Sequence, residues 1–254
     1  MYRILASAGE TKERRFQRAP RKIAAPRLVA RSSNEVWTWD ITKLRSLIRG
    51  QWYCLYVIID LYSRFVVGWT VAKSEDTRHA KKLFSEACAR HQIEPKTLTI
   101  HSDRGSVRTS DGLVALYERL GLTRSLSRPR VSNDNAYSES QFKTLKYQLD
   151  YPERFESLYH ARGWLQQFFS WYNDVHCHSG LALFTPAQIF HNKVSESVVV
   201  RQNALDAIYA EHPERFVNGA PCAVLPPDKV CINLQSGLDS CLILPQTRGV
   251  YEKA

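Results

Sequence analysis

Three strand-like segments that follow one another over short connections constrain the fold of this chain most strongly. Residues 36–42 alternate aromatic and β-branched side chains, residues 52–60 are almost continuously apolar, and residues 65–72 are rich in valine. Such runs are typical of strands, and connections shorter than about a dozen residues join antiparallel neighbours. The sequence therefore predicts an antiparallel meander.

Helical and strand-like patterns alternate after the meander. Asp76 is placed to cap an amphipathic helix, because apolar side chains recur at helical spacing behind it. Two short strands are expected over residues 98–101 and 121–126, and further helices over residues 112–120, 135–149, 156–173, 185–190 and 196–209. The order βββαβαβα predicts an α/β fold with a mixed sheet flanked by helices.

The helix expected over residues 135–149 carries an apolar stripe and possible caps. Phe142, Leu145 and Leu149 lie on one side of it and would dock it on the sheet. Residues 133–135, Asn-Asp-Asn, precede it, and side chains of this type commonly cap helices. We therefore expect at least one of these three residues to act as a cap.

Both ends of the chain depart from this pattern. The first 35 residues contain nine Lys and Arg against three Asp and Glu, and with Pro20 and Pro26 they predict an extended basic arm after a short helix. A solvated linker is the alternative interpretation. Strand-like patterns at residues 230–234 and 242–244 predict a small C-terminal extension. The expected division is a basic arm over residues 1–32, an α/β core over 33–195, and a helix with a strand-like tail over 196–254.

The charge balance favours an anionic partner. Lys and Arg number 35 against 25 Asp and Glu, which gives a formal charge of +10 and favours nucleic acid, although only weakly by itself. The longest apolar run, residues 52–59, is far shorter than the roughly 20 residues of a membrane-spanning helix. The six cysteines are scattered without a C-x-x-C pair, so we expect reduced thiols in a cytoplasmic protein with no membrane partner.

Three acidic residues stand out by their positions. Asp40 lies inside an apolar strand, Asp103 directly follows another strand, and Glu139 lies on a helix. Each is ambiguous alone, since Asp often forms turns and Glu on a helix usually faces solvent. A buried Asp40 would be costly without a cation or a hydrogen-bond partner. The spacing of all three is a more specific signal than any one of them: 62 residues separate Asp40 from Asp103, and 35 separate Asp103 from Glu139.

This spacing and its surroundings resemble the integrase catalytic core of the IS-three family of bacterial insertion-sequence transposases, the product of the second open reading frame and a relative of retroviral integrases. The similarity covers roughly residues 30 to 195. The segments that carry it are Trp39-Asp40-Ile41-Thr42, Asp60-Leu61-Tyr62-Ser63-Arg64, Val67-Gly68-Trp69, His101-Ser102-Asp103-Arg104-Gly105-Ser106, Asn133-Asp134-Asn135-Ala136, Glu139-Ser140 with Phe142 and Lys146, Tyr172-Asn173, His178-Ser179-Gly180-Leu181 and Thr185-Pro186-Ala187.

The resemblance implies a ribonuclease H-like fold with a mixed five-stranded sheet. It implies that Asp40, Asp103 and Glu139 form the catalytic triad and hold Mg²⁺ or Mn²⁺, with two ions when DNA is bound. Carboxylate oxygens suit these ions. The implied activity is cleavage and strand transfer of double-stranded DNA at element ends and target, by a homo-oligomer assembled on DNA in a nucleoid-associated setting.

Several basic and polar residues are candidates for DNA contact. Lys143, Lys146 and Asn135 share a helix face with Glu139 at 100° per residue, and the resemblance also implies a basic residue at position 146. A solvated lysine face is the alternative for both lysines. Arg128 and Arg130 bracket Pro129 in the loop before this helix, from which they would reach a phosphate backbone.

Two alternatives accompany this interpretation. The same fold would suit a ribonuclease H-like nuclease acting on RNA–DNA hybrids, or a catalytically incompetent DNA-binding relic of a transposase.

Residues 1–5 resemble only the end of the helix-turn-helix region that precedes the core in the family, so we expect an N-terminally truncated chain and an upstream-frame helix-turn-helix protein as a possible partner. His176, Cys177 and His178 do not have the spacing of a zinc site.

Overall fold

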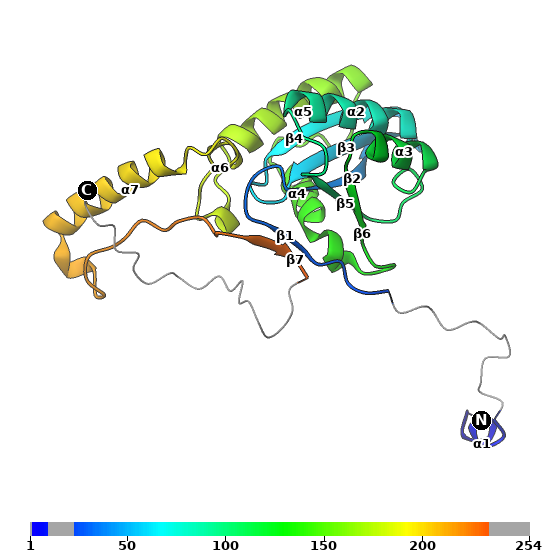
Figure 1. Ribbon diagram of the computed structural model, residues 1–254, viewed down its shortest axis with the longest axis horizontal. Coiled ribbons are helices and arrows are strands. Elements are labelled where there is room, and N and C mark those ends of the chain that lie inside the picture. Colours follow the sequence, from blue (N-terminus) through cyan, green and yellow to red (C-terminus); the bar gives the residue numbers. More distant parts are fainter. Residues whose placement is uncertain (1, 10–22, 234–254) are drawn as a thin grey trace.

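The predicted meander forms three of the five strands of a sheet in the computed structural model, which describes residues 2–9 and 23–233 (Figure 1). The strand order is β4-β3-β2-β5-β6. The bounds are Val36–Arg45 for β2, Trp52–Asp60 for β3, Val66–Ala72 for β4, Thr99–Ser102 for β5 and Thr123–Leu126 for β6. Strands β2, β3 and β4 pair antiparallel, whereas β5 and β6 run parallel to β2. The predicted mixed five-stranded sheet is confirmed.

Helices cover both faces of the sheet (Figure 1). Alternate residues of β2 point to opposite faces, so Trp37 and Trp39 pack against helices α2 (Thr77–Arg90) and α3 (Asp111–Arg119). Leu44 packs on the other face against helices α4 (Ala136–Lys146) and α5 (Leu158–Asp174). Because both faces are covered, the inner strand β3 is apolar along most of its length.

Helix α2 begins where its cap predicts. The Asp76 side chain accepts a hydrogen bond from the Arg78 backbone N–H at 2.7 Å. This bond satisfies one of the backbone donors that a helix leaves unpaired at its first turn.

Helix α4 is shorter than predicted and ends at Lys146. Leu149 lies beyond it, fully exposed, so its place in the predicted apolar stripe is wrong. The chain instead turns so that buried Phe155 pairs with the end of β2, donating its backbone N–H to the Arg45 carbonyl at 2.8 Å. Burial of a whole aromatic ring against the sheet outweighs one more helical turn carrying a single leucine.

Two short strands near the ends of the described range 23–233 pair beside the core (Figure 1). Strand β1 (Leu28–Ala30) pairs antiparallel with β7 (Val230–Ile232), and Ala30, Val230 and Ile232 pack against the core residues Val36 and Leu61. The end of the predicted arm is thus a strand, and the strand expected near residue 230 is confirmed. Most of the arm's basic residues and the strand expected at 242–244 lie outside the described residues.

The remaining elements are short, apart from one long helix. They are α1 (Tyr2–Ser7), the 3-10 helices η1 (Ser132–Asn135), η2 (Ser179–Leu181) and η3 (Pro213–Arg215), α6 (Pro186–Phe190) and α7 (Val194–Glu211). Helix α7 extends away from the sheet and is largely exposed (Figure 1). Within the described ranges, no helix combines the length and apolar character needed to cross a membrane.

Candidate active site

Asp40 lies in the middle of β2 on the face covered by α4, and its side chain is 15% exposed. Its Oδ2 accepts a hydrogen bond from Asn135 Nδ2 at 2.9 Å, and its Oδ1 accepts one from the Ile41 backbone N–H at 2.7 Å. The guanidinium of Arg108 also donates to Oδ1. Burial raises the pKa of Asp40, and the positive charge of Arg108 acts against this rise.

Asp103 directly follows β5 and is brought close to Asp40 by the parallel pairing of β5 with β2. Its side chain is 45% exposed, and its Oδ1 accepts a hydrogen bond from the Gly105 backbone N–H at 3.0 Å. The same oxygen lies 2.7 Å from Arg108 Nε. Two of the three predicted carboxylates therefore meet at one cation.

Glu139, the third predicted carboxylate, lies in the first turn of α4 and is exposed. Asn135, which directly precedes this helix, is the residue that contacts Asp40. The start of the helix that carries Glu139 is therefore tied to the strand that carries Asp40.

Arg108 is the residue at this site that the sequence analysis missed. Its side chain is only 6% exposed and contacts both Asp40 and Asp103. Its Nη1 also lies 3.9 Å from Glu75 Oε1. Its guanidinium carbon also lies 5.3 Å from the centre of the Trp39 ring. No pattern distinguishes Arg108 from the other arginines in the sequence, because the contact depends on how the loop after β5 folds back.

The donor set suits a divalent ion, but the described residues contain no group of three or more His, Cys, Asp and Glu close enough to hold one. Carboxylate oxygens are the ligands that Mg²⁺ and Mn²⁺ prefer. Asp40 and Asp103 converge as such ligands would, yet the position between them is taken by the guanidinium of Arg108. The chemistry of the carboxylates therefore fits a metal, whereas the arrangement of the loop does not.

Asp134 precedes α4 and holds the start of this helix through its buried carboxylate. It is fully buried, and its carboxylate accepts hydrogen bonds from the backbone N–H, Nε and Nη2 of Arg128 and from Asn233 Nδ2. The hydrogen bonds from Arg128 lower the pKa of Asp134 to about 2. Its backbone carbonyl lies 2.8 Å from His101 Nε2, which links this turn to β5.

The expectation that a side chain of residues 133–135 caps α4 is wrong. Asn135 occupies the cap position, but no side-chain hydrogen bond caps the helix. The physical reason is competition, because the Asn135 amide donates to Asp40 and the Asp134 carboxylate accepts from Arg128. A 3-10 turn, η1, leads into the helix instead.

The predicted DNA-contacting arginines have different surroundings. Arg128 is 32% exposed and forms an ion pair with Asp134 at 2.9 Å. Arg130 is exposed, and its φ of 61° turns the loop at this point.

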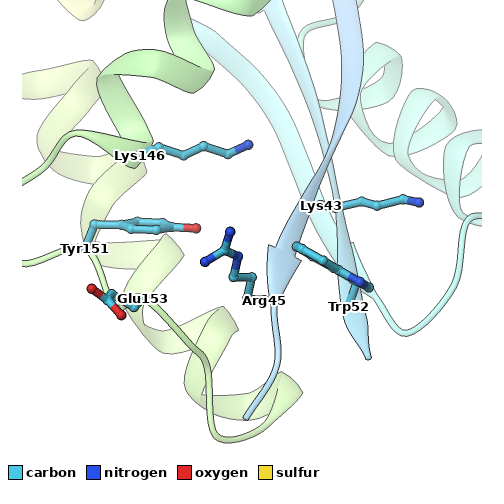
Figure 2. Close-up of a pocket in the computed structure, with 6 residues that line it drawn as sticks. All are labelled: Lys43, Arg45, Trp52, Lys146, Tyr151 and Glu153. Carbon is cyan, nitrogen blue, oxygen red and sulfur yellow. The ribbon is translucent and has the colours of Figure 1, made fainter. Parts of the chain in front are cut away.

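A basic groove lies at the end of the β2–β3 hairpin (Figure 2). It has a volume of about 420 Å³ and is lined by Lys43, Arg45, Trp52, Lys146, Tyr151 and Glu153. Figure 2 shows the Lys146 and Arg45 side chains extending from opposite sides into the space between α4 and β2.

Lys146 and Arg45, two cations of this groove, have contacts within the chain. Lys146 Nζ donates to Thr42 Oγ1 at 2.8 Å, and Thr42 lies two residues after Asp40 on β2. Lost hydration lowers the pKa of Lys146, and the nearby charge of Arg45 lowers it further. The Arg45 guanidinium carbon lies 5.8 Å from the centre of the Trp52 ring, whose side chain is 42% exposed. Lys143 is exposed on the same helix as Lys146.

Comparisons with known proteins give consistent matches. Two family models, both described as integrase core domain, match residues 30–132 and 120–186. The transposase for insertion sequence element IS904 of Lactococcus lactis subsp. lactis (strain IL1403) is 30% identical over 189 residues, which cover 72% of this chain and 74% of that protein. Transposase InsF for insertion sequence IS3A of Escherichia coli (strain K12) is 33% identical over 165 residues, covering 65% of this chain and 56% of InsF.

Among solved structures, the fold resembles a chain of the simian T-cell lymphotropic virus intasome in complex with PP2A regulatory subunit B56 gamma. The TM-score is 0.51 at 20% identity, with 67% of this chain and 60% of that chain covered. This likeness concerns the fold alone and agrees with the ribonuclease H-like arrangement of the sheet and helices.

Proposed function

Because the chain belongs to the IS3 family of insertion-sequence transposases and carries their integrase core, we propose that it cleaves and transfers strands of double-stranded DNA at insertion-element ends in a metal-dependent reaction. Polynucleotidyl transfer is the activity general to this family. The matches to insertion-sequence transposases favour this function over a nuclease specific for RNA–DNA hybrids.

The convergence of Asp40 and Asp103 on one cation is the observation that carries the assignment of the site. We assign Asp40, Asp103 and Glu139 as the residues that would hold Mg²⁺ or Mn²⁺, two ions with DNA present. When bound, such ions activate the attacking oxygen and stabilise the leaving oxygen of a displacement at phosphorus. Asn135 orients Asp40 by its hydrogen bond to Oδ2, and Thr42 and Lys146 extend the polar surface along β2.

The basic groove supports a path for DNA next to these carboxylates. Lys146, Arg45 and Lys43 supply positive charge for phosphate oxygens, and the half-exposed Trp52 ring offers a face on which a base stacks. Lys143 would contact the backbone from the adjoining surface of α4. Arg130 contributes from the loop, whereas Arg128 has one part of its guanidinium committed to Asp134.

Further partners follow from the family. We propose a homo-oligomer assembled on DNA, since two element ends and one target take part in a single reaction. Recognition of the ends would come from a helix-turn-helix protein of an upstream frame, together with the basic N-terminal residues. The matched relatives are bacterial, and we place the activity on the nucleoid in the cytoplasm.

A cleavage assay tests this function. The chain would be incubated with Mn²⁺ and a labelled branched DNA, and nicking and disintegration compared among the wild type, Asp103→Asn and Glu139→Gln. Glu118→Gln is the matched control, because Glu118 is exposed on α3. We expect cleavage by the wild type and the control only. Salt-sensitive DNA binding without any cleavage would instead identify a DNA-binding relic.

A further inference from the structure

We propose that Arg108 is a built-in counter-ion that occupies the cation position between Asp40 and Asp103, so that a divalent ion enters only when the guanidinium leaves. The inference rests on the proposed function, because it concerns the carboxylates assigned there to the metal. It adds a gate formed by this chain's own side chain.

The contacts of the guanidinium make it a substitute for a metal ion. Nη2 donates to Asp40 Oδ1, Nε lies 2.7 Å from Asp103 Oδ1, and Nη1 lies 3.9 Å from a carboxylate oxygen of Glu75. One positive charge thus compensates carboxylates from β2, from the loop after β5 and from the connection before α2. Two carboxylates that face the same point require such a cation, because their mutual repulsion is otherwise unopposed.

The surrounding residues are shaped to receive this side chain. The Arg108 side chain is 6% exposed, and its guanidinium lies against the face of Trp39. A Cβ at position 105 would overlap Arg108 Nη1, so the absence of a side chain at Gly105 makes room for the guanidinium. A burial of this kind differs from the loose placement of a surface arginine.

A metal ion and the guanidinium exclude one another. The guanidinium contacts Asp40 Oδ1 and Asp103 Oδ1, and a metal ion held by the same two carboxylates would carry positive charge into the same place, so the two cations would repel and compete. Glu75 gives the displaced side chain a destination, since its carboxylate is 34% exposed and already lies near Nη1. Metal entry is therefore coupled to a swing of Arg108 from the two aspartates toward Glu75.

The test is Mn²⁺ binding to the 254-residue chain without DNA, measured by calorimetry. We expect Arg108→Gln to bind Mn²⁺ at least about tenfold more tightly than the wild type, because removal of the cation frees both ligands. Arg119→Gln, on the exposed side of α3, is the control and should bind like the wild type. Equal Mn²⁺ affinity of the wild type and Arg108→Gln would overturn the proposal.

Asp103→Asn separates this inference from the proposed function. If the metal site is right, Asp103→Asn weakens Mn²⁺ binding in both the wild-type and the Arg108→Gln backgrounds, whether or not Arg108 competes. If Asp103→Asn changes the affinity in neither background, the carboxylate site itself is wrong, and the role of Arg108 is wrong with it.

A second measurement uses the wild type, in case Arg108→Gln fails to fold. The Nε–H resonance of Arg108 would be assigned by its loss in Arg108→Lys and followed during a Mg²⁺ titration. We expect it to shift with the same midpoint as Mg²⁺ binding. A resonance that stays unchanged at saturating Mg²⁺ would show that the guanidinium does not move, which contradicts the proposal.

Discussion

Asn135 and Asp40 are 95 positions apart in the sequence and are joined by a hydrogen bond of 2.9 Å from Nδ2 to Oδ2. The bond connects the residue before α4 to the middle of β2. It holds the carboxylate in one orientation and sets the start of the helix that carries Glu139. The geometry of the proposed active site thus depends on a neutral side chain as well as on the three acids.

Replacement of Asn135 by alanine should lower activity more than stability. A hydrogen bond to a charged group contributes about 1.5–3 kcal/mol, so we expect the rate of Mn²⁺-dependent nicking to fall by roughly tenfold to a hundredfold. Loss of the bond should also raise the pKa of Asp40 and shift the pH–rate profile upward, which a purely structural role would not do. Exposed Asn133 provides the control. The positioning role is wrong if Asn133→Ala and Asn135→Ala lose the same activity.

The ion pair of Arg128 and Asp134 should make the free energy of unfolding depend on pH in the acidic range. The pKa of Asp134 is about 2 in the folded chain against an ordinary value of 3.8. Because the pKa of Asp134 is lower in the folded chain than in the unfolded chain, its carboxylate stabilises the fold at pH values above 3.8. This stabilisation of about 2 kcal/mol is lost as the pH falls from 4 through 2. Urea unfolding at several pH values measures it.

Asp134→Asn is the variant for that measurement. It should lower the free energy of unfolding at pH 7 and flatten its pH dependence below pH 4. Asp111→Asn, at an exposed position of α3, should retain the wild-type dependence. A wild-type slope in Asp134→Asn would assign the acid sensitivity to other carboxylates.

Reversal of charge at Lys146 tests the basic groove. We expect Lys146→Glu to weaken binding of duplex DNA by about tenfold or more and to reduce the slope of log affinity against log salt by about one, because one phosphate contact is lost. Circular dichroism should show an intact fold, since Lys146 lies at the end of α4. Lys82→Glu, on exposed α2 surface across the sheet, should leave affinity nearly unchanged. Unchanged affinity of Lys146→Glu at physiological salt would rule out this contact.

The sequence predicts the sheet well because its signals are local and periodic. The three strands of the meander and the cap at Asp76 follow from alternation and from a single side chain, and the structure has them at nearly the predicted residues. The family resemblance, rather than a local pattern, implies that Asp40 and Asp103 lie together. The parallel pairing of β5 with β2 brings them close, because Thr38 pairs with His101 and each aspartate lies two residues further along.

Contacts between distant loops are what the sequence does not predict. Arg108 reaches Asp40 over 68 positions, and no periodicity marks it. Leu149 has the right spacing for the apolar stripe of α4, but the helix ends before it and Phe155 is buried against the sheet instead. Asp134 looks like a cap, yet Arg128 binds its carboxylate more strongly than a backbone N–H would.

A methyl group at position 105 should loosen the hold of Arg108 without removing its charge. A Cβ there would overlap Arg108 Nη1, the far end of a long side chain, and would lie 3.3 Å from Asp103 Oδ1, so we expect the guanidinium to shift more than the carboxylate or the backbone. Gly105→Ala should therefore bind Mn²⁺ more tightly than the wild type and less tightly than Arg108→Gln, with a change in stability within about 1 kcal/mol. In Gly112→Ala, the control on α3, the new Cβ meets only ordinary contacts, with the Thr77 methyl at 3.8 Å, and Mn²⁺ affinity should not change. A wild-type Mn²⁺ affinity in Gly105→Ala would mean that the guanidinium adapts without leaving the two aspartates, and steric room at Gly105 would then have no part in controlling metal entry.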